Sequence, residues 1–586
     1  MSEFPHAERD DLRDFTADKR LLRLAWMAAI IGIAGALAAW VLLRLIALFT
    51  NLAYFQRVSD TLPAFPAHLP AWTIAIPVAG SLVIGLMARY GSDKIRGHGI
   101  PEAIEAILIG QSRIEPKVAL LKPISSAISI GTGGPFGAEG PIIMTGGALG
   151  SLFAQLFHLS SAERKTLLVS GAAAGMTAVF GTPIAAVLLA VELLLFEWKP
   201  RSFVPVAIAA IIAGICRPFL IGSGPLFPYH GLAIMPWWGL GLCALMGIVA
   251  GLQSSLMTVC LYAVEDGFRR LPIHWMWWPA LGGLAVGIGG YFNPDVLGVG
   301  YDNIRALLTD GFGVHAAAAL LLGKMTVWII SLSSGTSGGV LAPLLIMGGA
   351  LGSLESHLLP FGDAGFWALL GMAAILGGTM RAPLTATFFA IELTGNVHVL
   401  LPVLAASVAA FALTVLLMKR SILTERIARR GLHLTREYGI DPFTDTPVRD
   451  IMSRPVDTLP ASMPIESAVA HFTSPEARHK SYPVLDDEGA PIGIVSRTDV
   501  LRWTRDGWDK GETLRIAACE LLVGYADELA GELADRMALR DIGRVPIIDR
   551  QTGRLVGLVA RRDLLRVRAL AQTEEQQRAR LLHIGG

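Results

Sequence analysis

The sequence predicts an all-α, polytopic membrane domain of two repeats with broken helices, which we expect to be inverted, followed by an α/β tandem domain pair. Three observations predict this organisation. A long apolar region covers most of the chain, that region contains two similar halves, and the polar tail carries a shorter repeat of its own.

The composition indicates a membrane protein. Hydrophobic residues make up 53% and charged residues 17% of the chain, whereas soluble proteins carry roughly 25% charged residues. The first apolar run, 21–49, is longer than the apolar core of a signal peptide, and Lys and Arg side chains flank its start. We therefore expect a cytosolic segment at 1–20 and a membrane domain at 21–433, with the N-terminus in the cytoplasm.

Charge and cysteine content exclude several classes of protein. The formal net charge is +1 without a basic face, so we expect no nucleic-acid partner. No C-x-x-C spacing occurs, which argues against a structural disulfide or a metal site, and the four cysteines are Cys216, Cys243, Cys260 and Cys519. Intramembrane metalloproteases need H-E-x-x-H to hold zinc, and this motif does not occur in the sequence. We therefore expect that the protein is not an enzyme.

Several apolar segments of the membrane domain are interrupted. Glycine and proline cluster at 97–101, 133–135 and 338–343, and many apolar segments are shorter than the roughly 20 residues that cross a bilayer. Short helices that end inside the membrane are typical of transport proteins with a central binding site. An ordinary bundle of complete spans explains the clustered breaks poorly.

An internal repeat divides the membrane domain into halves of about 21–215 and 234–433. The sequence PIIMTGGALGSL from Pro141 matches PLLIMGGALGSL from Pro343, and PIAAVLLAVEL from Pro183 matches PLTATFFAIEL from Pro383. All matches occur in the same order at nearly the same offset, so they indicate two related halves. A binding site is expected where their broken helices meet.

Glu139 is the strongest candidate for a functional residue. It lies in a glycine-rich break directly before a predicted helix, and the start of a helix attracts anions through unpaired amide groups. The alternative is a glutamate that only caps this helix. Aligning Pro141 with Pro343 places Glu139 opposite Leu341, so the shared packing of the halves does not require the carboxylate. Ionisable residues within a membrane are candidates for function by default.

The other two breaks predict an anion site lined by backbone. Each combines glycines, which let the main chain approach a ligand, with a proline that begins a helix. Three helix N-termini can then converge on one anion and bind it with amide groups, which hold it weakly enough for release. We expect anion-binding residues within these breaks, namely His98, Gly99, Ile100, Gly140, Val340 and Leu341. The alternative is that the His98 ring turns aside and only amide groups line the site.

At these residues the chain resembles the CLC family of chloride channels and chloride/proton exchangers. The three family signatures appear as G-H-G-I-P (97–101), G-A-E-G-P (137–141) and G-V-L-A-P (339–343). The resemblance implies a homodimer in the bacterial inner membrane with both termini in the cytoplasm. It further implies chloride as substrate, possible coupling to protons, no cofactor in the membrane domain, and Glu139 as the gating glutamate.

Four departures from the family pattern bear on mechanism. His98 replaces the central serine of the first signature, and Ala138 replaces the arginine before Glu139. Leu423 aligns with the tyrosine that closes the inner side of the chloride site, so the resemblance implies Leu423 as a further chloride-binding residue. Leu193 aligns with the glutamate that relays protons. Leucine carries no proton, so these losses favour passive, channel-like conduction over chloride/proton exchange, which stays the alternative. Glu192, one position earlier, repeats as Glu392 in the second half, and we expect both to pair structurally.

The polar tail resembles a tandem pair of CBS domains. Its repeats, 481–502 and 544–566, each contain a strand, a turn with Asp and Gly, a second strand and the start of a helix. Counting the earlier segments of each unit, we expect a linker at 434–445, CBS domains at 446–505 and 515–570, and a terminal segment at 571–586.

The resemblance implies an adenine nucleotide as a ligand of the CBS pair. Ser496, Asp499 and Asp563 match positions that bind the ribose in nucleotide-binding members, whereas Ala560 lacks the hydroxyl expected there. A purely structural, dimerising role is the alternative. CBS domains also occur in magnesium channels, but cation pathways use carboxylate-lined sites, and the breaks in this sequence offer amide groups instead.

Overall fold

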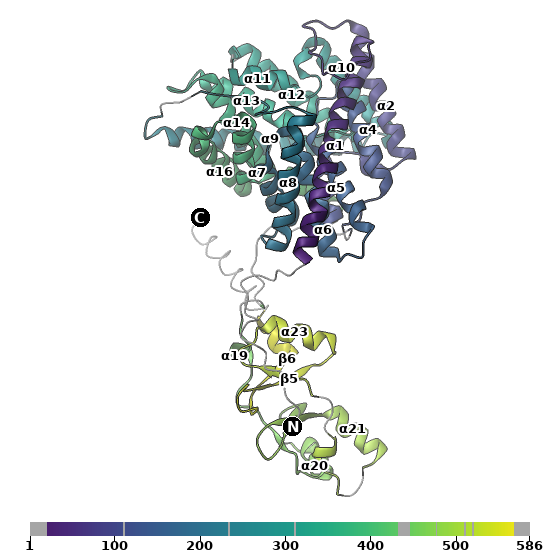
Figure 1. Cartoon of the computed structure of the whole chain (residues 1–586), viewed down its shortest axis with the longest axis vertical. Coiled ribbons are helices and arrows are strands. Elements are labelled where there is room, and N and C mark those ends of the chain that lie inside the picture. Colours follow the sequence, from purple (N-terminus) through teal and green to yellow (C-terminus); the bar gives the residue numbers. More distant parts are fainter. Residues whose placement is uncertain are drawn as a thin grey trace. The chain divides into compact units, whose positions relative to one another are not determined.

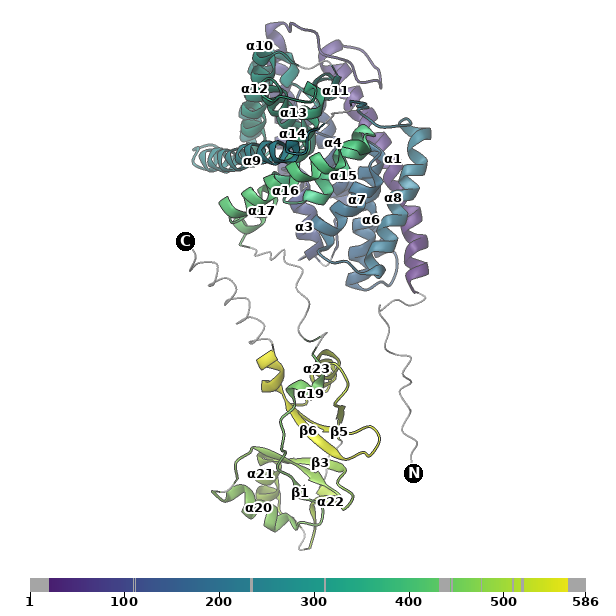
Figure 2. The same cartoon turned by 90° about the vertical axis from the view of Figure 1, so that its left-hand side faces the viewer.

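The computed structural model describes residues 20–108, 110, 112–231, 235–309, 312–431, 443, 446–475, 477–508, 511–517 and 521–567. The chain divides into two compact units, Met1–Glu437 and Tyr438–Gly586, which Figures 1 and 2 show from two directions. Most of the expected N-terminal segment at 1–20, most of the linker at 434–445, the terminal segment at 571–586, and Cys519 lie outside the described residues.

The described part of the first unit is helical. Its elements are α1 (Arg20–Phe55), η2 (Ala71–Ile74), α2 (Ala75–Tyr90), η3 (Asp93–Ile95), α3 (Ile100–Leu108), α4 (Pro116–Gly131), α5 (Glu139–Gln155), α6 (Ser161–Phe180), α7 (Pro183–Leu189), η4 (Ala190–Leu195), α8 (Pro200–Leu220), α9 (Gly239–Arg269), η5 (Trp275–Trp277), α10 (Trp278–Phe292), η6 (Pro294–Val296), α11 (Tyr301–Thr309), α12 (Val314–Ser333), α13 (Leu341–Ser356), α14 (Ala364–Met380), α15 (Pro383–Thr394), η7 (Val397–Val399), α16 (Leu400–Leu417) and α17 (Ile422–Arg429).

Several of these helices are long enough to cross a bilayer, and others are not. Among the described residues, six segments qualify by length and hydropathy: Arg20–Phe55, Ala71–Tyr90, Pro200–Leu220, Gly239–Arg269, Val314–Ser333 and Val397–Arg429. In contrast, α5 has 17 residues and α13 has 16, fewer than the roughly 20 needed to span the hydrocarbon core. The mixture confirms the predicted membrane domain with broken helices.

The repeat in the sequence corresponds to a repeat in the packing. A β-carbon added to Gly146 of α5 would lie 2.2 Å from the carbonyl oxygen of Gly171 in α6. In the second half, a β-carbon on Gly348 of α13 would lie 2.3 Å from the carbonyl oxygen of Gly371 in α14. Small residues let membrane helices approach closely. Each half therefore contains the same tightly packed helix pair.

Glu192 and Glu392 join the two halves reciprocally. Glu192 accepts hydrogen bonds from the backbone N–H of Leu384 (3.3 Å) and Thr385 (2.8 Å) at the start of α15. Glu392 accepts them from Ile184 (2.9 Å) and Ala185 (2.8 Å) at the start of α7, beside α15 (Figure 2). A carboxylate at a helix N-terminus satisfies unpaired amides and complements the helix dipole. The structural pairing expected for these glutamates is confirmed.

The two halves run in opposite directions. Arg20, which begins α1, forms an ion pair of 3.2 Å with Glu163 in the first turn of α6, so α5 ends on the face where α1 begins. Figure 1 shows α5 and α6 towards this end of the unit and α11 and α13 towards the other. The helices α5 and α13, which occupy equivalent positions in the repeat, thus lead to opposite faces, as inverted repeats require.

The second unit contains two similar α/β modules. The first has β1 (Leu459–Pro460), α20 (Ile465–Thr473), β2 (Ser481–Leu485), β3 (Pro491–Ser496) and α21 (Arg497–Asp506), and the second has β4 (Gly524–Tyr525), α23 (Ala530–Leu539), β5 (Arg544–Ile548) and β6 (Leu555–Ala560). The short helix α19 (Val448–Ile451) packs in the core of the second module, and Leu514 of α22 (Leu514–Ala517) packs in the core of the first. Each module has a three-stranded sheet, with strand order β1-β2-β3 or β4-β5-β6. In both sheets the first two strands are parallel and the last two are antiparallel. This confirms the predicted α/β pair.

Candidate functional site

The three interrupted segments meet inside the membrane unit. The backbone N–H of Gly97 donates to the carbonyl of Thr336 at 2.8 Å. Gly137 and Gly339 exchange two backbone hydrogen bonds of 3.2 and 2.9 Å. These bonds fasten together the loops that precede α3, α5 and α13, so the three helix N-termini converge as the sequence predicts.

Glycine is required at this meeting point because the main chains touch. A β-carbon on Gly140 would lie 1.9 Å from the carbonyl oxygen of His98, and one on Gly99 would lie 2.6 Å from the carbonyl oxygen of Gly140. Gly99 also has a positive φ of 89°, which residues other than glycine rarely adopt. Gly99, Ile100 and Gly140 of the predicted anion site are thereby brought together with Val340 and Leu341, which lie beside Gly339.

Glu139 is completely buried, and its carboxylate lies at the start of α13. Its Oε1 accepts a hydrogen bond of 3.1 Å from the backbone N–H of Ala342, while Oε2 has no hydrogen-bond partner among the described residues. A helix N-terminus within a membrane protein is a place where an anion binds. The carboxylate therefore occupies a position that suits a free anion, and it blocks that position in this conformation.

His98 lies beside a group of charged side chains. It is 1% exposed, and within the part of the chain that the structure describes neither ring nitrogen has a hydrogen-bond partner. The charges of Glu102, Arg426 and Lys122 act on the imidazole. Glu102 accepts from the backbone N–H of Gly99 at 2.9 Å and forms an ion pair of 3.4 Å with Arg426. The ring is thus buried, polar and not held by any bond to the described residues.

Lys122 is a residue of the site that the sequence analysis missed. It is fully buried in α4, and its Nζ donates to the carbonyl oxygens of Ile95 (2.8 Å) and Gly97 (2.7 Å). It therefore holds the loop that carries His98 and Gly99. Lys324 does the same in the second half, where its Nζ donates at 2.9 Å to Val296 and Gly298.

The signal for these lysines was present in the sequence. Each is a lysine within an apolar segment, and Lys324 precedes Leu341 by the same interval as Lys122 precedes Glu139. Charged residues in such segments are expensive unless they are paired. A repeated charge at equivalent positions therefore indicates a shared structural role.

Leu193 and Leu423, the two positions where the family pattern has polar side chains, lie on elements that contact α3. Leu193 is fully buried in the π-helical turn η4, and Leu423 is fully buried in the first turn of α17. Neither side chain can donate a hydrogen bond or carry a proton.

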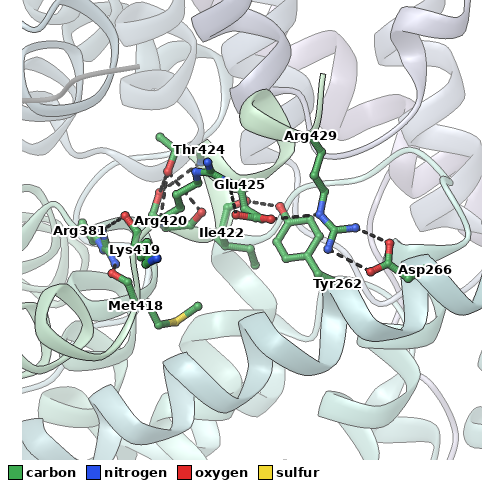
Figure 3. A network of polar contacts seen from close by, with 11 residues as sticks. Tyr262, Asp266, Arg381, Met418, Lys419, Arg420, Ile422, Thr424, Glu425 and Arg429 are labelled. Atoms are coloured by element: carbon green, nitrogen blue, oxygen red, sulfur yellow. Dashed lines mark hydrogen bonds and ion pairs between the residues drawn. The ribbon is translucent and has the colours of Figure 1, made fainter. Parts of the chain in front are cut away.

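The start of α17 is held instead by a polar network around it (Figure 3). The hydroxyl of Tyr262 donates to the carbonyl of Ile422 at 2.5 Å. Arg429 lies over the Tyr262 ring and forms ion pairs with Asp266 (2.5 Å) and Glu425 (3.1 Å). The network fixes where α17 begins, and with it the position of Leu423.

In the second unit the predicted nucleotide-binding residues are not brought together. A cavity of about 390 Å³ has Asp563 in its wall, together with the basic side chains Arg478, His479, Lys480, Arg544 and Arg562. Ser496 and Asp499 are not among its lining residues. They form a capping box at the start of α21, in which each side chain accepts a hydrogen bond from the backbone N–H of the other residue. Asp563 accepts a hydrogen bond of 2.8 Å from the backbone N–H of Ala560.

The fold and the site define a membrane transport protein whose central site, built from helix N-termini, suits an anion. The family model for the voltage-gated chloride channel matches residues 79–415, and the CBS domain model matches 448–506 and 521–570. The chain therefore belongs to the CLC family and carries a pair of CBS domains.

Relatives are similar over most of the membrane unit. A putative chloride channel protein, ClcB-like, from Ralstonia nicotianae is 29% identical over 397 residues, which cover 66% of this chain and 92% of that protein. The H(+)/Cl(-) exchange transporter ClcA from Salmonella agona is 28% identical over 450 residues, which cover 72% of this chain and 92% of that protein.

Solved structures show the same fold. A slow cyanobacterial Cl-/H+ antiporter has a TM-score of 0.62 at 24% identity, with 71% of this chain and 99% of that chain covered. A eukaryotic CLC transporter has a TM-score of 0.58 at 19% identity, with 93% of this chain and 98% of that chain covered.

Proposed function

We propose that the protein exchanges chloride for protons across the membrane through a pathway gated by Glu139. The observation that carries the proposal is the buried carboxylate at the N-terminus of α13, where an anion is expected to bind. Relatives described as H(+)/Cl(-) exchange transporters favour exchange over the passive conduction that Leu193 and Leu423 suggested.

The mechanism follows from competition for one place. A chloride ion that enters this place displaces the carboxylate, and a proton that neutralises the carboxylate removes its attraction to the amide groups. Chloride entry and proton uptake by Glu139 therefore support each other. Because Leu193 cannot carry a proton, the inner proton route runs without a side-chain relay at that position.

We further propose a homodimer in the bacterial inner membrane with both termini in the cytoplasm. The Lys and Arg side chains at the start of α1 support the orientation, because cytoplasmic flanks carry an excess of positive charge. The bacterial sources of the relatives support the location.

Exchange is tested by flux from liposomes that contain the purified protein. With a chloride gradient as the driving force, we expect protons to move against the chloride flow in a fixed ratio, recorded as a change in external pH. Protein-free liposomes are the control. Chloride flux without any proton movement would contradict exchange and favour channel-like conduction instead.

For the CBS pair we propose that the cavity beside Asp563 binds an adenine nucleotide. The basic side chains in its wall suit phosphate groups, and the carboxylate suits ribose hydroxyls. Titration calorimetry of ATP with the full-length protein is expected to show binding that Asp563→Asn weakens about tenfold, as for a lost charged hydrogen bond. Asp499→Asn is the matched control, since Asp499 is also an N-terminal cap but lies outside this cavity. Equal losses in both variants would contradict the assignment.

A further inference from the structure

A groove on the surface of the membrane unit lies along the part of α1 that is farthest from Arg20. Its volume is about 440 Å³. The polar side chains in its wall are Arg44, Ser59 and Asp60. The apolar side chains are Trp40, Val41, Leu45, Leu48 and Val58. The groove is therefore amphiphilic, with charged groups next to a surface that suits hydrocarbon.

One wall of the groove is the segment that follows α1 and folds back on the helix. Gln56 has a positive φ of 54°, which turns the chain just after the helix ends. The fully buried side chain of Asn51 then donates to the carbonyl oxygens of Ser59 (3.2 Å) and Thr61 (2.8 Å). These two hydrogen bonds hold residues 58–60 against α1, so the groove is built into the fold.

Arg44 and Asp60 form an ion pair in the wall of the groove. The Arg44 side chain is 44% exposed and that of Asp60 is 57% exposed. Ion pairs with this exposure stabilise a fold very little, so either side chain can exchange its partner for another charged group. The guanidinium of Arg44 also lies over the Trp40 ring, 5.5 Å from its centroid, which keeps it at the groove.

The position of this pair along α1 corresponds to the level of lipid head groups. At a rise of about 1.5 Å per residue, Arg44 lies about 36 Å along the helix from Arg20. A bilayer is about 40–45 Å thick with its head groups included, so the two arginines reach the head groups of opposite leaflets. From the groove towards Arg20, α1 exposes the apolar side chains of Val41, Leu37 and Ile33. They lie on one face of the helix and can pack against an acyl chain.

We propose that this groove binds a zwitterionic phospholipid with a primary ammonium head group, phosphatidylethanolamine. Arg44 binds the phosphate, because the guanidinium fork matches phosphate oxygens. Asp60 binds the ammonium group of the same lipid, and one acyl chain lies along Trp40 and Val41.

The paired charges distinguish this lipid from the two common alternatives. A cation and an anion side by side complement a head group that carries both charges. The ammonium of phosphatidylcholine is fully methylated and has no N–H to donate to the Asp60 carboxylate. Phosphatidylglycerol has no ammonium, so its negative charge meets the carboxylate without compensation. Lipid binding at this groove is independent of the proposed exchange of chloride for protons.

The test is lipid binding by the full-length protein in detergent, measured by native mass spectrometry with these three lipids carrying identical acyl chains. We expect the wild type to bind phosphatidylethanolamine about fivefold more tightly than either of the others, the size of one exposed charged hydrogen bond. Asp60→Asn should abolish this preference and strengthen phosphatidylglycerol binding, since the repelling charge is gone. Arg44→Gln should weaken binding of all three lipids about fivefold, because each carries a phosphate.

Asp302→Asn is the matched control, since Asp302 forms an exposed ion pair of 3.0 Å with Arg305 and lies outside the groove. It should keep the wild-type preference, and the thermal unfolding temperature should stay unchanged in every variant. Equal affinity of the wild type for phosphatidylethanolamine and phosphatidylcholine, or an unchanged preference in Asp60→Asn, would overturn the proposal. Tighter binding of phosphatidylglycerol would overturn it in favour of an anionic lipid. Failure of all three lipids to bind would overturn it in favour of a second copy of the chain on this face.

Discussion

Replacing Glu139 with glutamine is expected to abolish proton transport while chloride continues to cross the membrane at a rate that no longer depends on pH. Glutamine has nearly the shape of a protonated glutamate, but it cannot ionise or carry a proton. Without its negative charge the side chain competes poorly for the amide groups at the start of α13, where Glu139 now accepts from Ala342 at 3.1 Å. Proton flux should fall to the level of protein-free liposomes.

The measurement records chloride efflux and external pH together over a range of pH values. Glu192→Gln is the matched control, since Glu192 is a second glutamate in the membrane unit whose carboxylate caps α15 instead of facing the anion site. It should retain proton coupling. Unchanged pH dependence in Glu139→Gln would contradict the gate assignment and direct attention to His98, another titratable group at the meeting point of the helices.

The organisation of the membrane unit could be predicted because it is recorded locally in the sequence. Glycine–proline breaks mark where helices begin, and the repeat shows that the two halves share one packing. The same reasoning predicted that Glu192 and Glu392 pair structurally. It could not predict which backbone groups they cap, because these lie in the other half of the chain.

Contacts between distant segments account for what the sequence analysis missed. Lys122 is one example, because its side chain binds the carbonyls of Ile95 and Gly97 in another element, and only the folded structure shows this contact. The choice between exchange and conduction also escaped sequence reasoning. Leucine at 193 removes the proton relay of the family pattern, and leucine at 423 removes a gating hydroxyl, but neither change shows whether another proton route exists.

The buried lysines allow the anion site to be separated from the scaffold that supports it. Lys122→Met leaves the carbonyls of Ile95 and Gly97 without their donor, and Lys324→Met does the same to Val296 and Gly298. An unsatisfied buried acceptor costs about 1–3 kcal/mol, so each variant should lose roughly 2–6 kcal/mol of stability. Both are expected to unfold at a clearly lower temperature than the wild type, by similar amounts.

Their effects on chloride should differ, because only the Lys122 loop carries predicted ligands of the anion. The comparison is made in a Glu139→Gln background, so that competition between an ionised gate and chloride does not contribute to the measured affinity. There, Lys122→Met is expected to weaken chloride binding at least tenfold, since the amide groups of Gly99 and Ile100 lose their fixed positions. Lys324→Met should bind chloride as its parent does. Equal chloride affinities in the two lysine variants would show that the 97–100 loop does not contribute to the site, and would leave the helix starts of α5 and α13 as its remaining donors.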